Sequence, residues 1–407
     1  MATYKEQNKL NVPHLRFPEF QGEWCISTIG EQFDLYSGNT PSRLNKAHFE
    51  GNVNWITSGE LKEHYISDTK EKISEVAATA NNLKLLHPGT FVIAIYGLEA
   101  DGVRGTGSIT CKESTISQAC MAFTQKGDVK NEFLYSWYKK HGNIIGIKYA
   151  QGTKQQNLSY DILEKFHIAY PSQDEQDKLI KFISLLDERI ATQSKLIEDL
   201  KKLKSAISKL LFTRKDLLET TIRLADIATL KNGYAFQSSK YNILGKWKII
   251  TIANVSGGRY INEEDCNCII NLPNDIQDHQ VLKEGDILIS LTGNVGRVSL
   301  CKSGTYLLNQ RVGLLHIEGN IDKEFLYQVL SSRRFENNMV ACGQGAAQMN
   351  IGKRDVENFV LPYSSKANNI HLVARILHSY DECIINELRE LTLLTMQKQY
   401  FLAQMFI

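Results

Sequence analysis

Residues 186–212, LDERIATQSKLIEDLKKLKSAISKLLF, return as residues 380–406, YDECIINELRELTLLTMQKQYFLAQMF, and this repeated stretch decides the fold. From about residue 174 to residue 212 the chain contains no Pro or Gly and is rich in Leu, Ile, Lys and Glu. Apolar residues recur there at intervals of seven, which is typical of the seam of a coiled coil. The two copies therefore predict two long helices.

The two predicted helices share one interruption of the apolar seam. In the first helix the seam consists of two rows, Ile190, Ile197, Lys204 and Leu211, and Leu186, Gln193, Leu200 and Ile207. In the second helix the first row returns 194 residues later as Ile384, Leu391, Lys398 and Met405. Because the lysine recurs at the same place, the duplication extends to the detail of the seam.

Each predicted helix is too long for a small domain to cover. About 40 residues at about 1.5 Å per residue span roughly 60 Å, and a lone amphipathic helix of that length would leave its apolar stripe in water. Two matching stripes in one chain can pair, and antiparallel pairing would place one domain at each end. The alternative is that each helix packs only against its own domain.

The segments that precede the helices are also copies, about 193 residues apart. The matching segments are 88–93 and 284–289, 117–121 and 309–313, 133–135 and 325–327, 151–157 and 344–350, and 166–171 and 359–362. A repeat of this length is a duplicated domain, because solenoid repeats are only tens of residues long. We predict a mixed α+β fold with pseudo-twofold symmetry. Its parts are domains at 1–172 and 216–366, a central helix at 173–215 and a C-terminal helix at 367–407.

Each half shows strand-like runs followed by a helix. Apolar runs bounded by Gly or polar residues predict strands at 91–96, 119–123, 248–252 and 286–291. Helical spacing predicts one helix from Asn131, as a possible N-cap, to residue 145, and another from about 322 to 337. Each half is long enough to bury a core of its own.

Composition excludes several classes of protein. The 407 residues are 43% hydrophobic and 23% charged with a net charge of +2, so any basic surface for nucleic acid must be local. No run of about 18 apolar residues and no signal-peptide core occur, and Cys266 and Cys268 lack the spacing of a zinc knuckle. We therefore expect a cytoplasmic protein that does not contact membranes and holds no metal.

The motifs of self-sufficient enzymes are missing. The sequence contains no phosphate-binding P-loop, no His-Glu-x-x-His, no Gly-x-Ser-x-Gly and no aromatic tetrapeptide of amino-methyltransferases. The Gly-rich run at 102–107 does not open a helix, which argues against a dinucleotide site. The sequence therefore shows no candidate for a self-sufficient active site.

Two polar loops are the first candidates for contact with DNA. Their candidate residues are Lys154, Gln155, Gln156 and Asn157 in the first half and Gln348, Asn350 and Lys353 in the second. Gln and Asn amides can read adenine, and Lys can reach guanine or phosphate. The alternative is a solvated polar turn between a helix and a strand. Recurrence of the loop in both halves keeps the two interpretations open.

Further candidates follow strands or lie inside them. Arg104 in the first half, and Asn294 and Arg297 in the second, occupy glycine loops at strand ends, where an arginine suits contact with DNA. The alternative is a hairpin turn with an exposed arginine. Gln310 and Arg311 sit inside an apolar run, so partial burial with a structural role is the alternative to a base contact.

In their order and duplication, these segments resemble the specificity subunit of type I restriction-modification enzymes over essentially the full length. The resemblance rests on VPHLRFPEF at 12–20, GNTPS at 38–42, IAYP at 168–171 with Glu175 and Gln176 after it, GDILI at 285–289 and TGNVGR at 292–297. The second domain departs from the pattern at 364–369, which leaves the start of the last helix open.

The resemblance implies two target recognition domains, each reading one half of a bipartite, asymmetric sequence in double-stranded DNA. The helices would set the number of unread bases and dock two methyltransferase (M) subunits, with motor-nuclease (R) subunits joining for restriction. The chain would be the non-catalytic subunit of an adenine-N6 methyltransferase and ATP-dependent endonuclease. S-adenosylmethionine, ATP and Mg²⁺ would belong to the partners. The alternative is a coiled-coil adaptor that recognises proteins without reading DNA.

Overall fold

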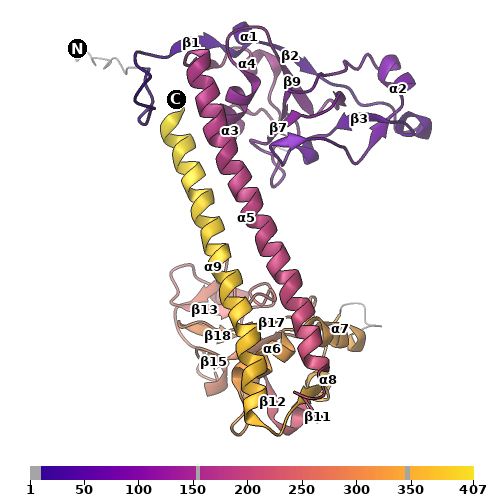
Figure 1. The fold of residues 1–407 in the computed structure, drawn as a ribbon, viewed down its shortest axis with the longest axis vertical. Coiled ribbons are helices and arrows are strands. Elements are labelled where there is room, and N and C mark those ends of the chain that lie inside the picture. The colour runs from indigo at the N-terminus through magenta and orange to yellow at the C-terminus, as the bar shows by residue number, and fades with distance from the viewer. Residues whose placement is uncertain (1–10, 153–155, 344–348) are drawn as a thin grey trace. The chain divides into compact units, whose positions relative to one another are not determined.

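The computed structural model describes residues 11–152, 156–343 and 349–407, which form two compact units (Figure 1). Unit 1 is Met1–Thr192 with Leu391–Ile407, and unit 2 is Gln193–Glu390. The long helices α5 (Gln173–Thr213) and α9 (Ala367–Met405) contribute to both units. Each unit contains parts of both helices, so this division does not test the predicted boundaries between domains and helices, which stay a prediction.

Unit 1 is built from ten strands and four further helices among its described residues. The strands are β1 (Cys25–Thr28), β2 (Phe33–Ser37), β3 (Val53–Ile56), β4 (Tyr65–Ile66), β5 (Lys72–Ile73), β6 (Phe91–Ala94), β7 (Gly107–Thr110), β8 (Ser114–Ile116), β9 (Cys120–Gln125) and β10 (His167–Tyr170). The helices are α1 (Ile29–Gln32), α2 (Glu75–Ala80), α3 (Asn131–Tyr149) and α4 (Tyr160–Leu163). The sheets have the orders β2-β9-β6-β7-β4, β5-β3-β8 and β1-β10.

The described part of unit 2 has a matching set of elements. Its strands are β11 (Thr220–Arg223), β12 (Ala228–Asn232), β13 (Trp247–Ile250), β14 (Asn267–Ile269), β15 (Val281–Leu282), β16 (Ile287–Ser290), β17 (Val298–Leu300), β18 (Tyr306–Leu308), β19 (Val312–Ile317) and β20 (Val360–Tyr363). Its further helices are α6 (Lys323–Leu330), α7 (Arg333–Cys342) and α8 (Lys353–Glu357). The sheet orders are β12-β19-β16-β17, β14-β13-β18-β15 and β11-β20.

The two units share one topology. The order β2-β9-β6-β7 in unit 1 corresponds to β12-β19-β16-β17 in unit 2, and the parallel pair β3–β8 corresponds to the parallel pair β13–β18. Where β4 pairs in parallel with β7, unit 2 has a single parallel bridge between Tyr260 and Leu300. The duplication seen in the sequence is therefore a duplication of strand order.

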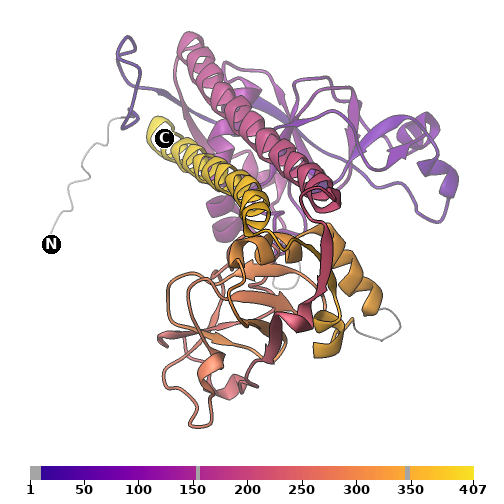
Figure 2. The same cartoon turned by 60° about the horizontal axis from the view of Figure 1, so that its bottom comes forward.

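The prediction of one helix at about 322–337 is wrong in one respect, because the chain forms two helices there, α6 and α7. Figure 1 labels both helices, and Figure 2 shows the same chain from a second direction. The side chain of Ser332 accepts a hydrogen bond from the amide of Phe335 and caps a new helix. Serine competes for backbone hydrogen bonds inside a helix and is favoured at its start. The counterpart α3 is continuous and begins at Asn131 itself, with Lys130 as N-cap and no side-chain cap bond.

Each core receives the far end of the helix that follows the other domain. The core of unit 1 includes Leu402, Met405 and Phe406 from the end of α9, and the core of unit 2 includes Leu211 and Phe212 from the end of α5. The alternative in which each helix packs only against its own domain is therefore wrong.

Within each unit the paired helix segments run antiparallel, as predicted. In unit 1 the rings of Phe182 and Phe401 lie 4.9 Å apart, and Asp187 pairs with Lys398. In unit 2, Lys204 pairs with Asp381, and Asn369 of α9 donates to the carbonyl of Leu217, just beyond the end of α5. Rising numbers on α5 meet falling numbers on α9, so the arrangement in unit 2 repeats that in unit 1 with the roles of the helices exchanged.

The two long helices begin differently, which resolves the departure at 364–369. Gln176 is fully buried at the start of α5, where its side chain donates to the carbonyls of Asp128 and Pro171 and accepts from the amide of Lys130. Helix α9 begins at Ala367 and carries no such glutamine at its start. Ile370, which stands 194 residues after Gln176, is an apolar side chain buried at the start of α9.

Candidate nucleic-acid interface

In unit 1 the two loops that the sequence singled out are joined by hydrogen bonds. The amide of Gln156 donates to the Glu99 carboxylate at 2.8 Å, and the amide of Leu98 donates to the Gln156 carbonyl at 3.2 Å. The amide of Leu158 donates to the carbonyl of Ile95, directly after β6. The strand-end glycine loop and the polar loop therefore form one continuous edge. The bond from Gln156 also holds the pKa of the Glu99 carboxyl below its ordinary value.

Arg104 and Gln156, predicted separately, contact each other. The Arg104 guanidinium donates to the Gln156 side-chain oxygen at 2.8 Å, and its stem packs over Gly146 of α3. Both residues are half-buried. A contact of Arg104 with DNA would therefore come from a guanidinium that is already oriented by Gln156. Lys154 and Gln155, from the same loop, lie outside the described residues.

Unit 2 brings the equivalent loops together in the same way. The amide of Gly293 donates to the Met349 carbonyl at 2.9 Å, and the amide of Ile351 donates to the carbonyl of Leu291 at 2.9 Å. The hydroxyl of Thr292 donates to the side-chain oxygen of Asn350 at 3.4 Å. Gln348 lies outside the described residues.

A third segment joins this edge in each unit. The amide of Leu291 donates to the Arg311 carbonyl at 3.0 Å, as the amide of Ile95 donates to the Ala119 carbonyl at 2.9 Å. Gln310 and Arg311 are both exposed, so the expectation that they are partly buried is wrong. They occupy the turn before β19 rather than the strand itself, and a turn presents its side chains to solvent.

Two glycines allow the strand-end loops to pass close to a helix. Gly105 and Gly296 have φ of +70° and +75°, in the left-handed region that side chains rarely adopt. A Cβ atom would come within 2.8 Å of the Asn143 amide nitrogen in the first case and 2.6 Å of the Met339 Cβ in the second. The glycines that made these loops conspicuous in the sequence are thus required by packing.

The remaining candidates of unit 2 lie at or near this edge. Asn294 and Asn350 are exposed. Arg297 lies 3.8 Å from the Glu336 carboxylate, and Lys353, the first residue of α8, lies 3.6 Å from Glu357. We name each of these edges the recognition edge. In unit 1 it includes Arg104 and Gln156, and in unit 2 it includes Asn294, Gln310, Arg311 and Asn350.

The duplication also appears in comparison with known families. Residues 21–202 and, again, residues 219–395 match the type I restriction modification DNA specificity domain. The chain belongs to this family. Its role is therefore DNA sequence specificity through two tandem recognition domains, in place of the adaptor alternative.

Known type I specificity subunits are similar along nearly the whole chain. The MjaVIII specificity subunit of Methanocaldococcus jannaschii is 25% identical over 389 residues, which are 89% of this chain and 86% of the relative. The crystal structure of the type I S subunit from M. genitalium has a TM-score of 0.58 at 18% identity and covers 97% of this chain and 99% of its own. A second solved structure, described as the structural basis of complex assembly and conformational transition of the type I R-M system, has a TM-score of 0.58 at 15% identity. The match covers 93% of this chain and 96% of that chain.

This specificity subunit has a further charged feature in unit 2. A groove of about 860 Å³ in unit 2 runs between the end of α5 and the start of α7. Its basic lining residues are Lys201, Lys202, Lys204, Lys209, Arg333 and Arg334. The arginines belong to α7, in the segment where the sequence predicted one continuous helix. Lys202 is paired with Glu198 on the same helix, so part of the charge is balanced locally.

Within the described ranges, no group of His, Cys, Asp or Glu residues is arranged to hold a metal ion. The same part of the chain contains no helix with the length and apolar character needed to cross a membrane.

Proposed function

We propose that each unit reads one half of a bipartite DNA sequence through its recognition edge. The supporting observation is that both units join the same three segments at one edge while their side chains differ. The edge of unit 1 carries Arg104 bonded to Gln156, whereas the edge of unit 2 carries exposed Asn294, Arg311 and Asn350. A common scaffold with different polar side chains suits two different half-sites, since sequence is read by side chains that reach base edges.

The proposal includes the partners that carry out the chemistry. We propose that two methyltransferase subunits and, for restriction, motor-nuclease subunits assemble on this chain, which makes it the non-catalytic subunit of an adenine-N6 methyltransferase and endonuclease. S-adenosylmethionine, ATP and Mg²⁺ would be bound by those partners. Because its target would be cellular DNA, we propose that the complex acts in the cytoplasm.

Methylome sequencing of cells that express this chain with its methyltransferase partner tests the proposal. We expect methylated adenines in a motif with two different halves separated by unread bases. A continuous motif, or a methylation pattern unchanged when this chain is deleted, would contradict it.

A matched pair of alanine variants tests which edge reads which half. Gln156→Ala should relax only the half-site of unit 1, and Arg311→Ala only that of unit 2, each by about 1–3 kcal/mol of discrimination, the usual worth of a good bidentate base contact. Methylome sequencing of each variant gives the measurement. Equal weakening on all sequences would instead identify a phosphate contact.

We also propose that the long helices set the number of unread bases. Deleting residues 193–199 and 387–393 together removes one seven-residue repeat from each helix and keeps the seam in phase. The helices shorten by about 10 Å, equivalent to roughly three base pairs at about 3.4 Å each. We expect a shorter spacer with both half-sites unchanged. Methylation mapping that found altered half-sites at constant spacing would refute the ruler.

A further inference from the structure

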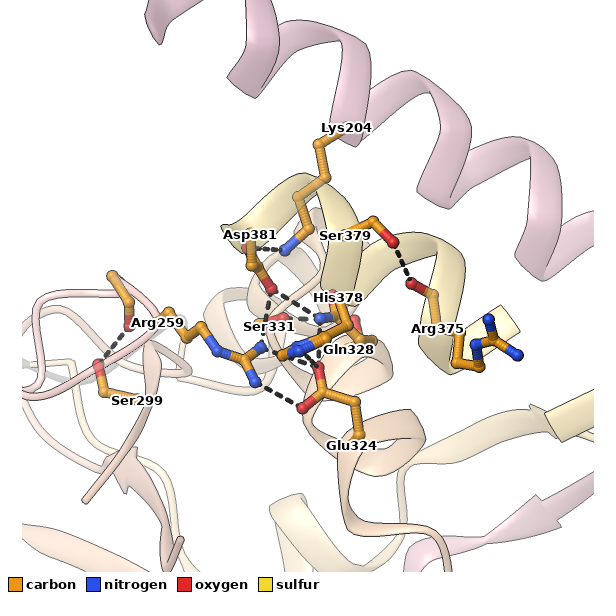
Figure 3. A network of polar contacts seen from close by, with 11 residues as sticks. Lys204, Arg259, Ser299, Glu324, Gln328, Ser331, Arg375, His378, Ser379 and Asp381 are labelled. Carbon is orange, nitrogen blue, oxygen red and sulfur yellow. Dashed lines mark hydrogen bonds and ion pairs between the residues drawn. The ribbon is translucent and has the colours of Figure 1, made fainter. Parts of the chain in front are cut away.

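In unit 2 a buried arginine joins the recognition domain to both long helices (Figure 3). Arg259, in the loop between β13 and β14, donates to Glu324 of α6 at 2.6 Å and to Asp381 of α9 at 3.0 Å. Asp381 also accepts from Lys204 of α5 at 2.5 Å. The side chain of Arg259 is only 7% exposed. One cation thus links the domain to α9 and, through Asp381, to α5.

Two tyrosine rings enclose this arginine. Its guanidinium carbon lies 5.6 Å from the ring centre of Tyr260 and 5.1 Å from that of Tyr327, which is within the range of cation–π attraction. Gln328 donates to both carboxylates that flank the arginine, at 2.7 Å to Glu324 and 2.6 Å to Asp381. His378 of α9 lies 3.5 Å from the Glu324 carboxylate and also faces this network. We name the group around Arg259 the joint of unit 2.

Unit 1 has the same joint with one change. Arg259 and Tyr260 correspond to His64 and Tyr65. Glu324 and Tyr327 correspond to Glu132 and Tyr135, and Asp381 and Lys204 correspond to Asp187 and Lys398. The His64 Nε2 lies 2.8 Å from the Glu132 carboxylate, and its Nδ1 lies 3.4 Å from that of Asp187. The imidazole stacks between the rings of Tyr65, at 4.1 Å, and Tyr135, at 3.9 Å. Lys398 pairs with Asp187 from the other helix.

The exchange of arginine for histidine has a chemical consequence. A guanidinium is always charged and offers donors to both carboxylates at any pH of interest. An imidazole donates from both nitrogens only when it is protonated, because the neutral ring has one donor and one acceptor. After loss of the proton, the lone pair of one His64 nitrogen would face a carboxylate oxygen, and no hydrogen bond could join these two acceptors.

The surroundings of His64 favour the protonated ring. Burial alone would lower the pKa of His64, but the bonds to Asp187 and Glu132 outweigh it and raise the pKa above 6.5. The same contacts, with Lys398, hold the pKa of Asp187 below its ordinary value against the effect of burial. The other ionisable groups that face this joint from the packed elements are Lys139 of α3, Glu63 and Cys111.

We propose that His64 and Arg259 are positioning residues that hold the two recognition domains on the helix pair, His64 in a pH-dependent manner and Arg259 independently of pH. The inference rests on the proposed function in one respect, namely that each domain reads its own half-site. Stability from a raised histidine pKa is complete below about pH 6.5 and is lost as the pH rises through the folded-state pKa. The first half-site should therefore lose affinity on the alkaline side, and the second should not.

Hydrogen–deuterium exchange of the full chain between about pH 6 and about pH 9 tests the joint without DNA. After correction for the intrinsic pH dependence of exchange, the protection of amides around His64 should fall as the pH rises. The expected fall is on the order of tenfold for each pH unit by which folding raises the pKa of His64. Protection around Arg259 should stay constant when it is measured in a His378→Gln background, which removes the imidazole 3.5 Å from Glu324. His64→Arg should give unit 1 the flat profile of unit 2, and Arg259→His should transfer the pH dependence to unit 2. A purely structural contact would not exchange its pH profile in this way.

Lys139 provides the control, because burial and the nearby Lys398 lower its pKa to about 8, within the same range. Lys139→Arg keeps the charge and removes that titration, so the wild-type profile should persist. A profile abolished by Lys139→Arg, or unchanged by His64→Arg, would overturn the proposal.

The second readout uses the complex with its methyltransferase partner and duplexes altered in one half of the mapped target. Discrimination in the first half alone should weaken at alkaline pH and be restored by His64→Arg. Loss in both halves alike would overturn the role of His64 in positioning. Absence of sequence-specific binding at every pH, with the exchange difference intact, would support the joint and count against the proposed function.

Discussion

Replacing Asp381 by alanine should destabilise unit 2 by about 3–5 kcal/mol, the usual effect of removing one partner from a buried ion network. Asp381 accepts from Lys204, Arg259 and Gln328 and is only 9% exposed. Without it, Lys204 and Arg259 lose the carboxylate that they share. Denaturant unfolding of the full chain, followed by hydrogen exchange within unit 2, measures the loss.

The matched variant in unit 1 is Asp187→Ala, and its cost should be smaller. Asp187 is 24% exposed, and His64 can release its proton when the carboxylate is removed, whereas Arg259 cannot. The cost of Asp187→Ala should also shrink as the pH rises through the pKa of His64, since the wild-type contact is lost there as well. Equal costs for the two variants at all pH values would contradict this account.

Replacing Phe406 by alanine should destabilise unit 1 by about 3–5 kcal/mol, as expected for a large-to-small change in a core. Phe406 follows α9 but is only 2% exposed, and its ring lies 5.2 Å from that of Phe133 in α3. Removing the ring would leave a cavity between α3 and the end of α9. The same unfolding experiment, with hydrogen exchange in α3, provides the measurement.

Met396→Ala is the control for this prediction, because Met396 lies on α9, ten residues before Phe406, and is 63% exposed. Its effect should stay within about 0.5 kcal/mol. A large effect of Met396→Ala, or a small effect of Phe406→Ala, would show that the end of α9 is not part of the core of unit 1.

The features that repeat along the chain were predictable. Apolar spacing indicated both long helices, and the strands β6, β9, β13 and β16 lie where apolar runs predicted them. The recurrence of the polar and glycine loops pointed to the segments that the structure brings to one edge in each unit. Periodicity and repetition express local propensity and burial, so they can be read without knowing which distant residues meet.

The partners of individual polar side chains were not predictable in this way. Arg104 and Gln156 appeared as independent DNA contacts, and the structure bonds them to each other. The break between α6 and α7 was missed because a serine cap competes with an otherwise helical pattern. Gln310 and Arg311 looked embedded in a strand, yet the turn before β19 exposes them.

The sequence by itself determined that this protein is a domain and a helix written twice, including the seam lysines Lys204 and Lys398. Only the tertiary structure decided what those lysines do. Each reaches an aspartate on the other helix, and that aspartate anchors His64 in one unit and Arg259 in the other. The spacing of a seam is set by the helical repeat, which the sequence carries locally. The pairing of charges between segments more than 100 residues apart is set by how the folded chain closes on itself.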